Sequence, residues 1–350
     1  MRYSHIIHAI TSEPWAILPE KFAAICAVVE LRAGGGLVPR AEIDAIVAAN
    51  PRPTNRSTGA VAVINVFGTI AQRANLMTEM SGGVSTEQLA ATIRQAVADE
   101  TVGSIILNID SPGGSVFGVQ ELGDVIHAAR GTKPIVAIAN SLAASAAYWL
   151  GSQADELVVT PSGEVGSIGV VAAHIDQSAA NEQMGVRVSY VTAGKYKAEN
   201  NPDEPLTDEG RAHIQARVND YYAAFTRAVA RGRGVKPADV QSGFGEGRVV
   251  GAHEAVRLGM ADRVETFDAL VARMRGGGRA RRGVVAATTA SEFTVMLTEG
   301  DFTALADTIV LEQFSPAPAG LSEEPETARE SGSDADLDRR RRRLRLLSHG

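Results

Sequence analysis

The sequence predicts an α/β protein in which helices pack against a largely parallel sheet. Short apolar runs predicted as strands alternate along the chain with amphipathic or small-residue stretches predicted as helices. Such alternation is typical of parallel sheets, because each parallel pair of strands needs a long crossover connection, usually a helix. The chain has 350 residues, of which 45% are hydrophobic, so it can bury a sizeable core.

Composition and targeting signals argue against several classes of protein. The net charge of −7 gives no general reason to expect nucleic-acid binding, and a lone cysteine, Cys26, excludes an intrachain disulfide framework. Residues 1–10 lack the basic-then-apolar order of a secretory signal, and the apolar run 22–31 is too short to span a bilayer. No metal spacing or dinucleotide fingerprint occurs. We therefore expect a cytoplasmic protein with no membrane anchor, no metal and no cofactor.

Changes in composition divide the chain into four predicted parts. They are an N-terminal arm (1–58), a main domain (59–274), a hinge with a short helical segment (275–314) and a charged tail (315–350). The arm is expected to be flexible, with short helices at 21–31 and 41–49. The tail is rich in Pro, Ser and Glu and ends near the arginine cluster 339–343, so we expect it to be disordered. The basic glycine-rich stretch 275–283 is a candidate site for self-processing.

The first half of the main domain is predicted from strand and capping signals. A β-rich strand covers 60–67, and Ser85 is the predicted N-cap of a helix, with Gln88 completing a capping box. That helix has an apolar face made of Leu89, Ile93 and Val97. The remaining elements are a strand at 104–109, a helix that ends near 129, a strand at 135–139, a helix that opens near Ser145 and a strand at 157–160.

The second half of the main domain is predicted in the same way. Its expected elements are a short helix at 177–184, a strand at 186–192, a long helix at 207–231, a short helix between turns within 247–262 and a last strand at 264–267. The long helix carries one apolar stripe, made of Ile214, Val218, Tyr221, Phe225 and Val229. That stripe is equally consistent with burial in the core and with an interface between subunits.

Ser145 is the candidate nucleophile. It follows a buried strand and opens a helix among small residues. At a helix N-terminus, free backbone N–H groups favour developing negative charge, which suits a nucleophile. Taken alone, this pattern is also common wherever a helix packs tightly.

A glycine-rich turn supplies a second candidate element. Asp110-Ser111-Pro112-Gly113-Gly114-Ser115 comes directly after the strand 104–109. Two glycines let backbone N–H groups approach a ligand, and such groups can act as an oxyanion hole. A run of this kind is more often an ordinary turn, and its place between strand and helix favours the functional interpretation.

The general base is harder to find from the residues themselves. None of the seven histidines lies beside a glycine-rich turn of the kind that builds active sites, although a distant triad partner stays open. Lysine is the other choice, because a buried ammonium can lose its proton near neutral pH. Lys195 and Lys197 occur together in a Gly-Lys-Tyr-Lys turn after a predicted strand, a pattern that also fits a solvated basic turn.

Four short motifs together resemble the signal peptide peptidase A-type serine peptidases. In order they are Ser111-Pro112-Gly113-Gly114, Ala143-Ala144-Ser145, Gly166-Ser167-Ile168-Gly169-Val170 and Tyr196-Lys197. The resemblance covers about residues 60–270 and implies a ClpP/crotonase-like fold built from repeated β-β-α units. Carried over by position, Ser145 would be the nucleophile and Lys197 the general base. The backbone N–H groups of Gly114 and Ala146 would form the oxyanion hole, and Ser167 would orient the lysine.

Two departures from the family pattern bear on these roles. Many members have Gly-Gly after the serine, whereas this chain has Ala146-Ala147, and Ala146 still supplies a backbone N–H. Lys195 lies two residues before Lys197. In an extended turn the two lysine side chains would point to opposite sides, so only one of them can face Ser145. The position directly after Tyr196 favours Lys197.

The lack of an anchor and the charged tail resemble the tailed-bacteriophage branch of the family, which consists of prohead proteases. This implies protein substrates, namely scaffold, capsid or portal proteins and the protease itself, and a homo-oligomer inside the prohead in the host cytoplasm. Three alternatives stay open. They are a cellular signal-peptide-degrading peptidase, a crotonase-like acyl-CoA enzyme with Glu164 as a candidate carboxylate, and a non-catalytic capsid scaffold.

Overall fold

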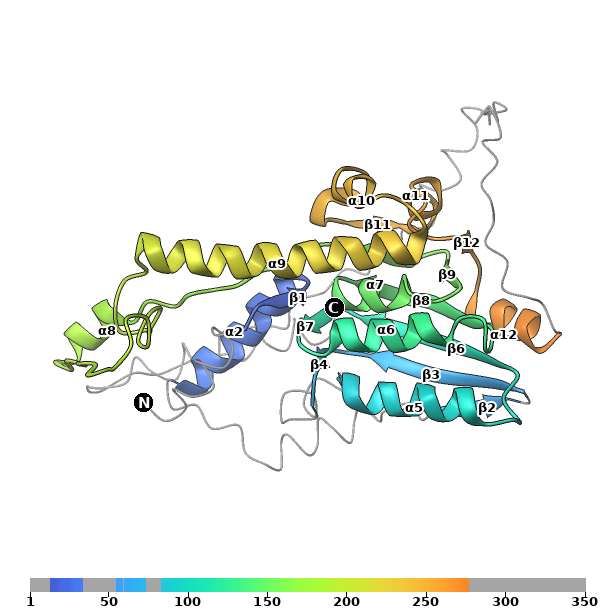
Figure 1. Cartoon of the computed structure of the whole chain (residues 1–350), viewed down its shortest axis with the longest axis horizontal. Helices are drawn as coiled ribbons and strands as arrows, with labels where there is room; N and C mark the ends of the chain where they lie inside the picture. The colour runs from blue at the N-terminus through green and yellow to red at the C-terminus, as the bar shows by residue number, and fades with distance from the viewer. Residues whose placement is uncertain (1–12, 34–54, 59, 74–82, 277–350) are drawn as a thin grey trace, which may run out of the picture. The chain divides into compact units, whose positions relative to one another are not determined.

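The computed structural model describes residues 13–33, 55–58, 60–73 and 83–276, all within one compact unit (Figure 1). Helices pack on a mixed, mainly parallel sheet, so the predicted α/β class is confirmed. The predicted helix at 41–49, the stretch 277–314 and the tail 315–350 lie outside the described residues. The four-part division of the chain therefore stays a prediction.

The main sheet carries the strands that lead to the candidate site. Its parallel centre is formed by β3 (Val61–Phe67), β6 (Ser104–Ser111), β8 (Ile135–Ala144), β9 (Glu156–Val159) and β10 (Glu164–Gly166). Antiparallel strands β2 (Arg56–Thr58) and β11 (Val249–Gly251) pair with β3 and β10, and β12 (Arg263–Val264) is parallel to β9. The central strands are almost fully buried, as expected for a parallel sheet covered on both faces.

Helices cover the two faces of this sheet unequally. The larger core lies against α5 (Thr86–Ala98), α6 (Val119–Ala129), α7 (Ala146–Gly151) and α9 (Asp208–Arg233). A smaller core on the other face is closed by α12 (Phe267–Arg275), which inserts Leu270 and Met274 among sheet valines and isoleucines. Burying apolar surface stabilises the fold by about 25 cal/mol per Å², and burial against distant segments of this kind holds short elements such as α7 in place.

A second, smaller sheet lies beside the glycine-rich turn. In order, its strands are β1 (Trp15–Ile17), β7 (Gly113–Ser115), β4 (Ile70–Ala71) and β5 (Val84–Ser85). β1 belongs to the stretch predicted as the N-terminal arm, and it leads into α2 (Pro19–Ala33). The described part of the arm is thus paired with a strand almost a hundred residues away along the chain.

The predicted N-cap Ser85 is found, and two further caps set the bounds of α9. Ser85 accepts a hydrogen bond from the Gln88 backbone N–H at 3.4 Å and so caps α5. Thr207 caps α9 in the same manner, and Gly234 ends it in a left-handed conformation with φ of 72°. These local signals set the bounds of both helices.

Two predicted elements differ in the structure. Residues 186–192 were expected to form a strand, but they have no regular secondary structure, because no strand pairs with them among the described residues. The short helix predicted within 247–262 is present as α11 (Ala252–Arg257). The residues before it form strand β11, whose last residue, Gly251, directly precedes the helix. The sequence also missed α10 (Pro237–Gly243), whereas the short helix α8 (Ser178–Gln183) was predicted.

Within the described part of the chain, no helix combines the length and the apolar character that crossing a membrane would require.

Candidate active site

Ser145 lies at a sharp corner between β8 and α7. Its side chain is fully buried, and its backbone has φ of 55° and ψ of −118°, a conformation that non-glycine residues rarely adopt. The Ser145 backbone N–H donates to Gly166 O at 2.7 Å, and the hydroxyl lies 3.4 Å from Gly169 O. Such strain costs about 1–3 kcal/mol and persists only where surrounding structure fixes it, so it marks a functional corner.

The helix that follows is held by its two aromatic residues. Trp149 stacks on Phe225 of α9 with ring centroids 4.8 Å apart and planes 15° from parallel. Tyr148 donates its hydroxyl to Met260 O at 2.9 Å, and burial raises the pKa of this phenol well above its usual value. Both side chains are almost completely buried, and their close packing holds α7 in a single position. Ser145, the N-cap of α7, is therefore held in place as well.

The glycine-rich turn meets Ser145 directly. A Cβ placed on Gly113 would lie 3.0 Å from Cβ of Ser145, and one on Gly114 would lie 1.9 Å from Ile70 O. Gly113 also has φ of 97°, so neither position tolerates a side chain. Ser111 supports the turn, since its hydroxyl donates to Gly68 O at 2.6 Å and accepts from the Gly113 N–H at 3.2 Å. The turn is therefore built for close backbone approach.

Ser167 lies on the third segment at this corner. It is buried, has φ of 52°, and its backbone N–H donates to Arg248 O at 2.8 Å. Its neighbour Gly166 accepts the hydrogen bond from Ser145. Four of the five candidate residues, namely Gly114, Ser145, Ala146 and Ser167, therefore come from segments that meet.

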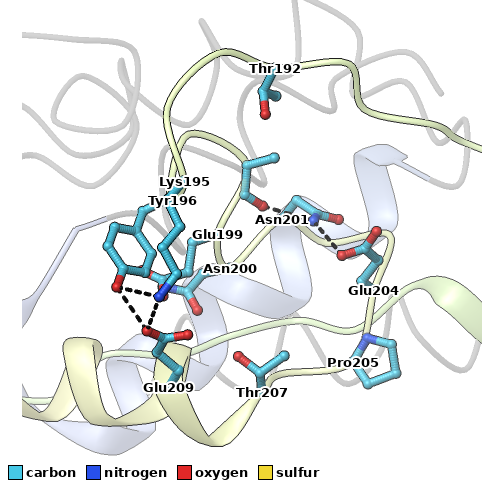
Figure 2. Close-up of a pocket in the computed structure, with 11 residues that line it drawn as sticks. Thr192, Lys195, Tyr196, Glu199, Asn200, Asn201, Glu204, Pro205, Thr207 and Glu209 are labelled. Atoms are coloured by element: carbon cyan, nitrogen blue, oxygen red, sulfur yellow. Dashed lines mark hydrogen bonds and ion pairs between the residues drawn. The ribbon is translucent and has the colours of Figure 1, made fainter.

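The two candidate lysines have an entirely different environment. Lys195 and Lys197 are both exposed and lie on the loop before α9. Lys195 Nζ lies 2.8 Å from the Tyr196 hydroxyl and 3.0 Å from Glu209 Oε1, and the hydroxyl donates to the same oxygen at 2.8 Å (Figure 2). These hydrogen bonds to Tyr196 and Glu209 raise the pKa of Lys195 and favour its charged form.

The lysine loop is nevertheless well organised. The buried Asn201 donates to Ala198 O at 2.9 Å and to Glu204 Oε2 at 3.1 Å, and it accepts from the Asp203 N–H at 3.0 Å. These contacts surround a pocket of about 250 Å³ that is lined by Lys195, Tyr196 and Ala198 but not by Lys197 (Figure 2). Lys197 is therefore not part of this pocket.

The lysine loop and the helix after Ser145 contact different parts of α9. The loop is attached through Glu209 in the first turn of α9, whereas α7 packs at Phe225 and Ala228 in its C-terminal half (Figure 1). Glu209 and Phe225 are 16 positions apart, which corresponds to about 24 Å along an α-helix. Within one chain, the structure does not bring Lys197 to Ser145.

A groove begins next to the nucleophile. Val170 follows Gly169, whose carbonyl oxygen faces the Ser145 hydroxyl, and lines a cavity of about 670 Å³ against the N-terminal half of α9. Apolar side chains of Leu206, Ile214 and Val218 line its other wall. The half-exposed part of the α9 stripe therefore lines a groove rather than the core.

Other candidate chemistry finds little support in the geometry. Glu164, the carboxylate considered for an acyl-CoA enzyme, is exposed on β10 and pairs through its backbone with Leu142 and Gly251. Among the described residues, no cluster of three or more His, Cys, Asp or Glu side chains is placed to hold a metal ion.

Sequence reasoning missed one neighbour of the site. β1 lies against Gly113–Ser115, where Ala16 faces Gly114, although residues 15–17 were assigned only to the arm. The available signal was a short apolar run, Trp15-Ala16-Ile17, between two prolines.

Comparisons with known proteins show which peptidases the chain is similar to. Residues 127–280 match the sequence profile of Peptidase family S49. The chain is 32% identical over 275 residues to the head-tail preconnector protein GP5 of Enterobacteria phage P21, covering 74% of this chain and 54% of that protein. It is 31% identical over 276 residues to the capsid assembly protease C of Escherichia phage lambda, covering 74% and 62%. It is also 30% identical over 216 residues to protease 4 of Salmonella typhi, covering 61% and 34%. The chain therefore spans between half and two thirds of the two phage relatives.

Proposed function

Because the chain contains a domain of peptidase family S49, with the ClpP/crotonase-like α/β fold of that family, we propose that it is a serine endopeptidase of phage capsid assembly. The observation that carries this proposal is the Ser145 corner, where a buried, strained serine meets a glycine turn and opens a helix. Few structural roles require a serine in that conformation.

In this mechanism Ser145 attacks the substrate carbonyl. Backbone N–H groups of Gly114 and Ala146 would stabilise the oxyanion that develops, because preorganised donors act most strongly in a dry site. Loss of one such donor typically costs about 10²–10³ in kcat. Ser167, on the adjoining segment, would orient the lysine that takes the proton from Ser145.

Lys197 is the better candidate for the base than Lys195. A base must be uncharged to accept a proton, and the hydrogen bonds of Lys195 to Tyr196 and Glu209 favour the ammonium form. Lys197 is exposed, has no ion pair among the described residues and is not part of the lining of the pocket beside it. It is therefore available to a site outside its own loop.

We further propose that Lys197 reaches Ser145 of a neighbouring subunit. The lysine loop contacts the first turn of α9, whereas Trp149 near Ser145 stacks on its C-terminal half, and this favours a base supplied by a second copy. The loop also carries an exposed apolar strip, with Val191 at 99% exposure. The strip consists of Met184, Val186, Val188, Tyr190, Val191 and Tyr196. Its exposed apolar side chains suit contact with another copy.

The proposed substrates are proteins of the capsid assembly, namely scaffold, capsid or portal protein and the protease itself. The name of the lambda relative, capsid assembly protease C, supports this class. The groove that starts at Val170 has both apolar and polar walls, and it would hold side chains of an extended substrate next to the proposed nucleophile. The proposed place of action is the prohead in the host cytoplasm.

Covalent labelling tests this function without knowledge of the natural substrate. The full-length protein would be treated with a biotinylated fluorophosphonate, and the modified residue located by mass spectrometry. We expect labelling of Ser145, and a Ser141→Ala control on the same strand should label normally. Absence of labelling at Ser145 in the assembled protein, or equal labelling of Ser145→Ala, would refute the nucleophile assignment.

A further inference from the structure

The slot beside the nucleophile is already occupied by the chain's own strand β1. Trp15 exchanges two backbone hydrogen bonds of 2.8 Å with Val171, and on its other edge β1 pairs antiparallel with β7. Further along the same ladder, the Leu18 N–H donates to Pro112 O at 2.9 Å. β1 therefore lies between the glycine-rich turn and the segment that follows Gly169.

The register of β1 places Ala16 at the candidate oxyanion hole. Ala16 is opposite Gly114, and the bond from Leu18 to Pro112 lies two residues further along each strand. Antiparallel ladders alternate hydrogen-bonded and non-hydrogen-bonded pairs, so Ala16 and Gly114 form a hydrogen-bonded pair. The backbone N–H proposed to hold a substrate oxyanion is thus turned toward β1.

The carbonyl of Ala16 also approaches Ser145. A Cβ placed on Gly113 would lie 2.2 Å from Ala16 O and 3.0 Å from Cβ of Ser145. Both groups therefore surround the same point next to the turn. A substrate carbonyl would have to take this place in order to be attacked.

β1 is fixed by apolar anchors on the side away from Ser145. Trp15 and Ile17 are buried against Phe22 of α2, with the rings of Trp15 and Phe22 5.9 Å apart. Alternation along the strand then directs Ala16, which has no exposed surface, toward the main core. Near the start of the strand, the Ser115 hydroxyl donates to Glu13 Oε2 at 3.2 Å.

We propose that β1 is a built-in occupant of the substrate slot, and that substrates bind by replacing it as an extended strand with a small residue at the Ala16 position. This inference rests on the proposed peptidase function. Strand addition to a free edge is a common way to bind extended peptides, and main-chain hydrogen bonds supply much of the affinity. A tethered strand competes at an effective concentration in the millimolar range, so it keeps out weak substrates. The arm would thereby restrict cleavage to substrates that bind tightly or arrive at high local concentration.

Peptide binding tests this proposal without requiring catalysis. All proteins would carry Ser145→Ala, and a fluorescein-labelled peptide of residues 13–21 would be titrated by fluorescence anisotropy. Two full-length variants loosen β1. The double variant Trp15→Ala and Phe22→Ala removes two of the apolar side chains that anchor β1. The variant Ala16→Arg places a long charged side chain at a position that is fully buried. Phe267→Ala, which removes an apolar ring at the far core under α12, is the matched control.

We expect both loosened variants to bind the peptide at least tenfold more tightly than the parent and the control. A peptide with Ala16→Arg should bind none of them. Equal binding by all proteins, or no binding even to the Ala16→Arg protein, would overturn the proposal. Thermal unfolding of each variant checks that the fold persists, and Ala16→Arg covers the case in which the double variant fails to fold.

Fluorophosphonate labelling then separates this inference from the proposed function. With Ser145 present, the loosened variants should label at least tenfold faster than the parent, and the free peptide should slow them. Equal rates for parent and variants would reject β1 as the occupant and leave the nucleophile intact. Peptide binding without labelling of Ser145 in any protein would instead reject the peptidase function, while it would support β1 as the occupant of the slot.

Discussion

The Ser145 corner and the lysine loop are opposite kinds of site. Ser145 is fully buried, strained and held by α7, whose tryptophan stacks on Phe225 in the core. Lys197 is exposed on a loop that is organised by polar contacts and flanked by uncovered apolar side chains. The nucleophile is complete within one chain, whereas the proposed base is presented outward. Under the proposed function, this difference would couple activity to assembly.

Such coupling would suit the proposed role in capsid assembly, because the proposed substrates include the protease itself. A single copy would hold a serine without its base, and β1 would occupy the slot as well. Cleavage would then wait until copies meet at high local concentration. Substitutions in the buried corner and in the exposed loop should therefore have different effects.

The largest effect is expected at the nucleophile. Ser145→Ala should lower peptide cleavage by at least about 10³-fold, because the proposed acyl intermediate forms on the Ser145 hydroxyl. The hydroxyl makes only a long contact to Gly169 O, so the thermal midpoint should change little. Cleavage assays and calorimetry on the same preparation check both points, with Ser141→Ala as the control. Activity within tenfold of the parent would remove Ser145 from the mechanism.

The next effect concerns the choice between two lysines. Lys197→Ala should reduce kcat by about 10²–10⁴-fold, the usual contribution of a general base. Lys195→Ala should cost much less, because its ammonium is bound to Tyr196 and Glu209 and serves to organise the loop. Parallel steady-state kinetics decide between them. Loss of activity only in Lys195→Ala would reverse the assignment.

A third prediction concerns the support of the buried corner. Trp149→Ala should destabilise the protein by about 3–5 kcal/mol, the typical cost of truncating a buried tryptophan. The lost stacking on Phe225 should also loosen Ser145 and slow labelling. Chemical denaturation measures the first effect and fluorophosphonate labelling the second. Full stability in this variant would contradict the view that α7 is held by α9.

The smallest effect is expected on the exposed strip. Val191→Asp should weaken self-association about tenfold, because it introduces a charge into a proposed interface without disturbing any buried contact. Ala91→Asp, at an exposed position of α5, is the matched control. Sedimentation velocity over a concentration series compares the two. Unchanged association by Val191→Asp would place the interface elsewhere.

The buried corner could be predicted from sequence because its signals are local. An apolar strand, a serine and a small-residue helix follow one another, and the glycine turn ends the neighbouring strand at the same edge of the sheet. Packing then determines details such as the φ of Ser145, which no propensity reveals. The caps of α5 and α9 are equally local, and Ser85 and Thr207 were predictable in position.

The lysine loop and β1 could not be predicted because their structure depends on distant partners. Residues 186–192 have strand-like alternation, yet a strand needs a neighbour and the described chain offers none. β1 is only three residues long, and its pairing with Gly113–Ser115 joins segments far apart along the chain. Motif resemblance placed Lys197 near Ser145 in function, while the lysine loop and the helix after Ser145 contact different parts of α9 within one subunit.

The most direct test is complementation between two inactive variants. Ser145→Ala and Lys197→Ala would be purified separately, mixed in equal amounts, allowed to exchange subunits and assayed for peptide cleavage. If the base acts on the serine of a neighbour, random mixing should restore about a quarter of the sites. We predict clear recovery in the mixture and none in either variant alone. A mixture that exchanges subunits and stays inactive would contradict a site shared between two copies.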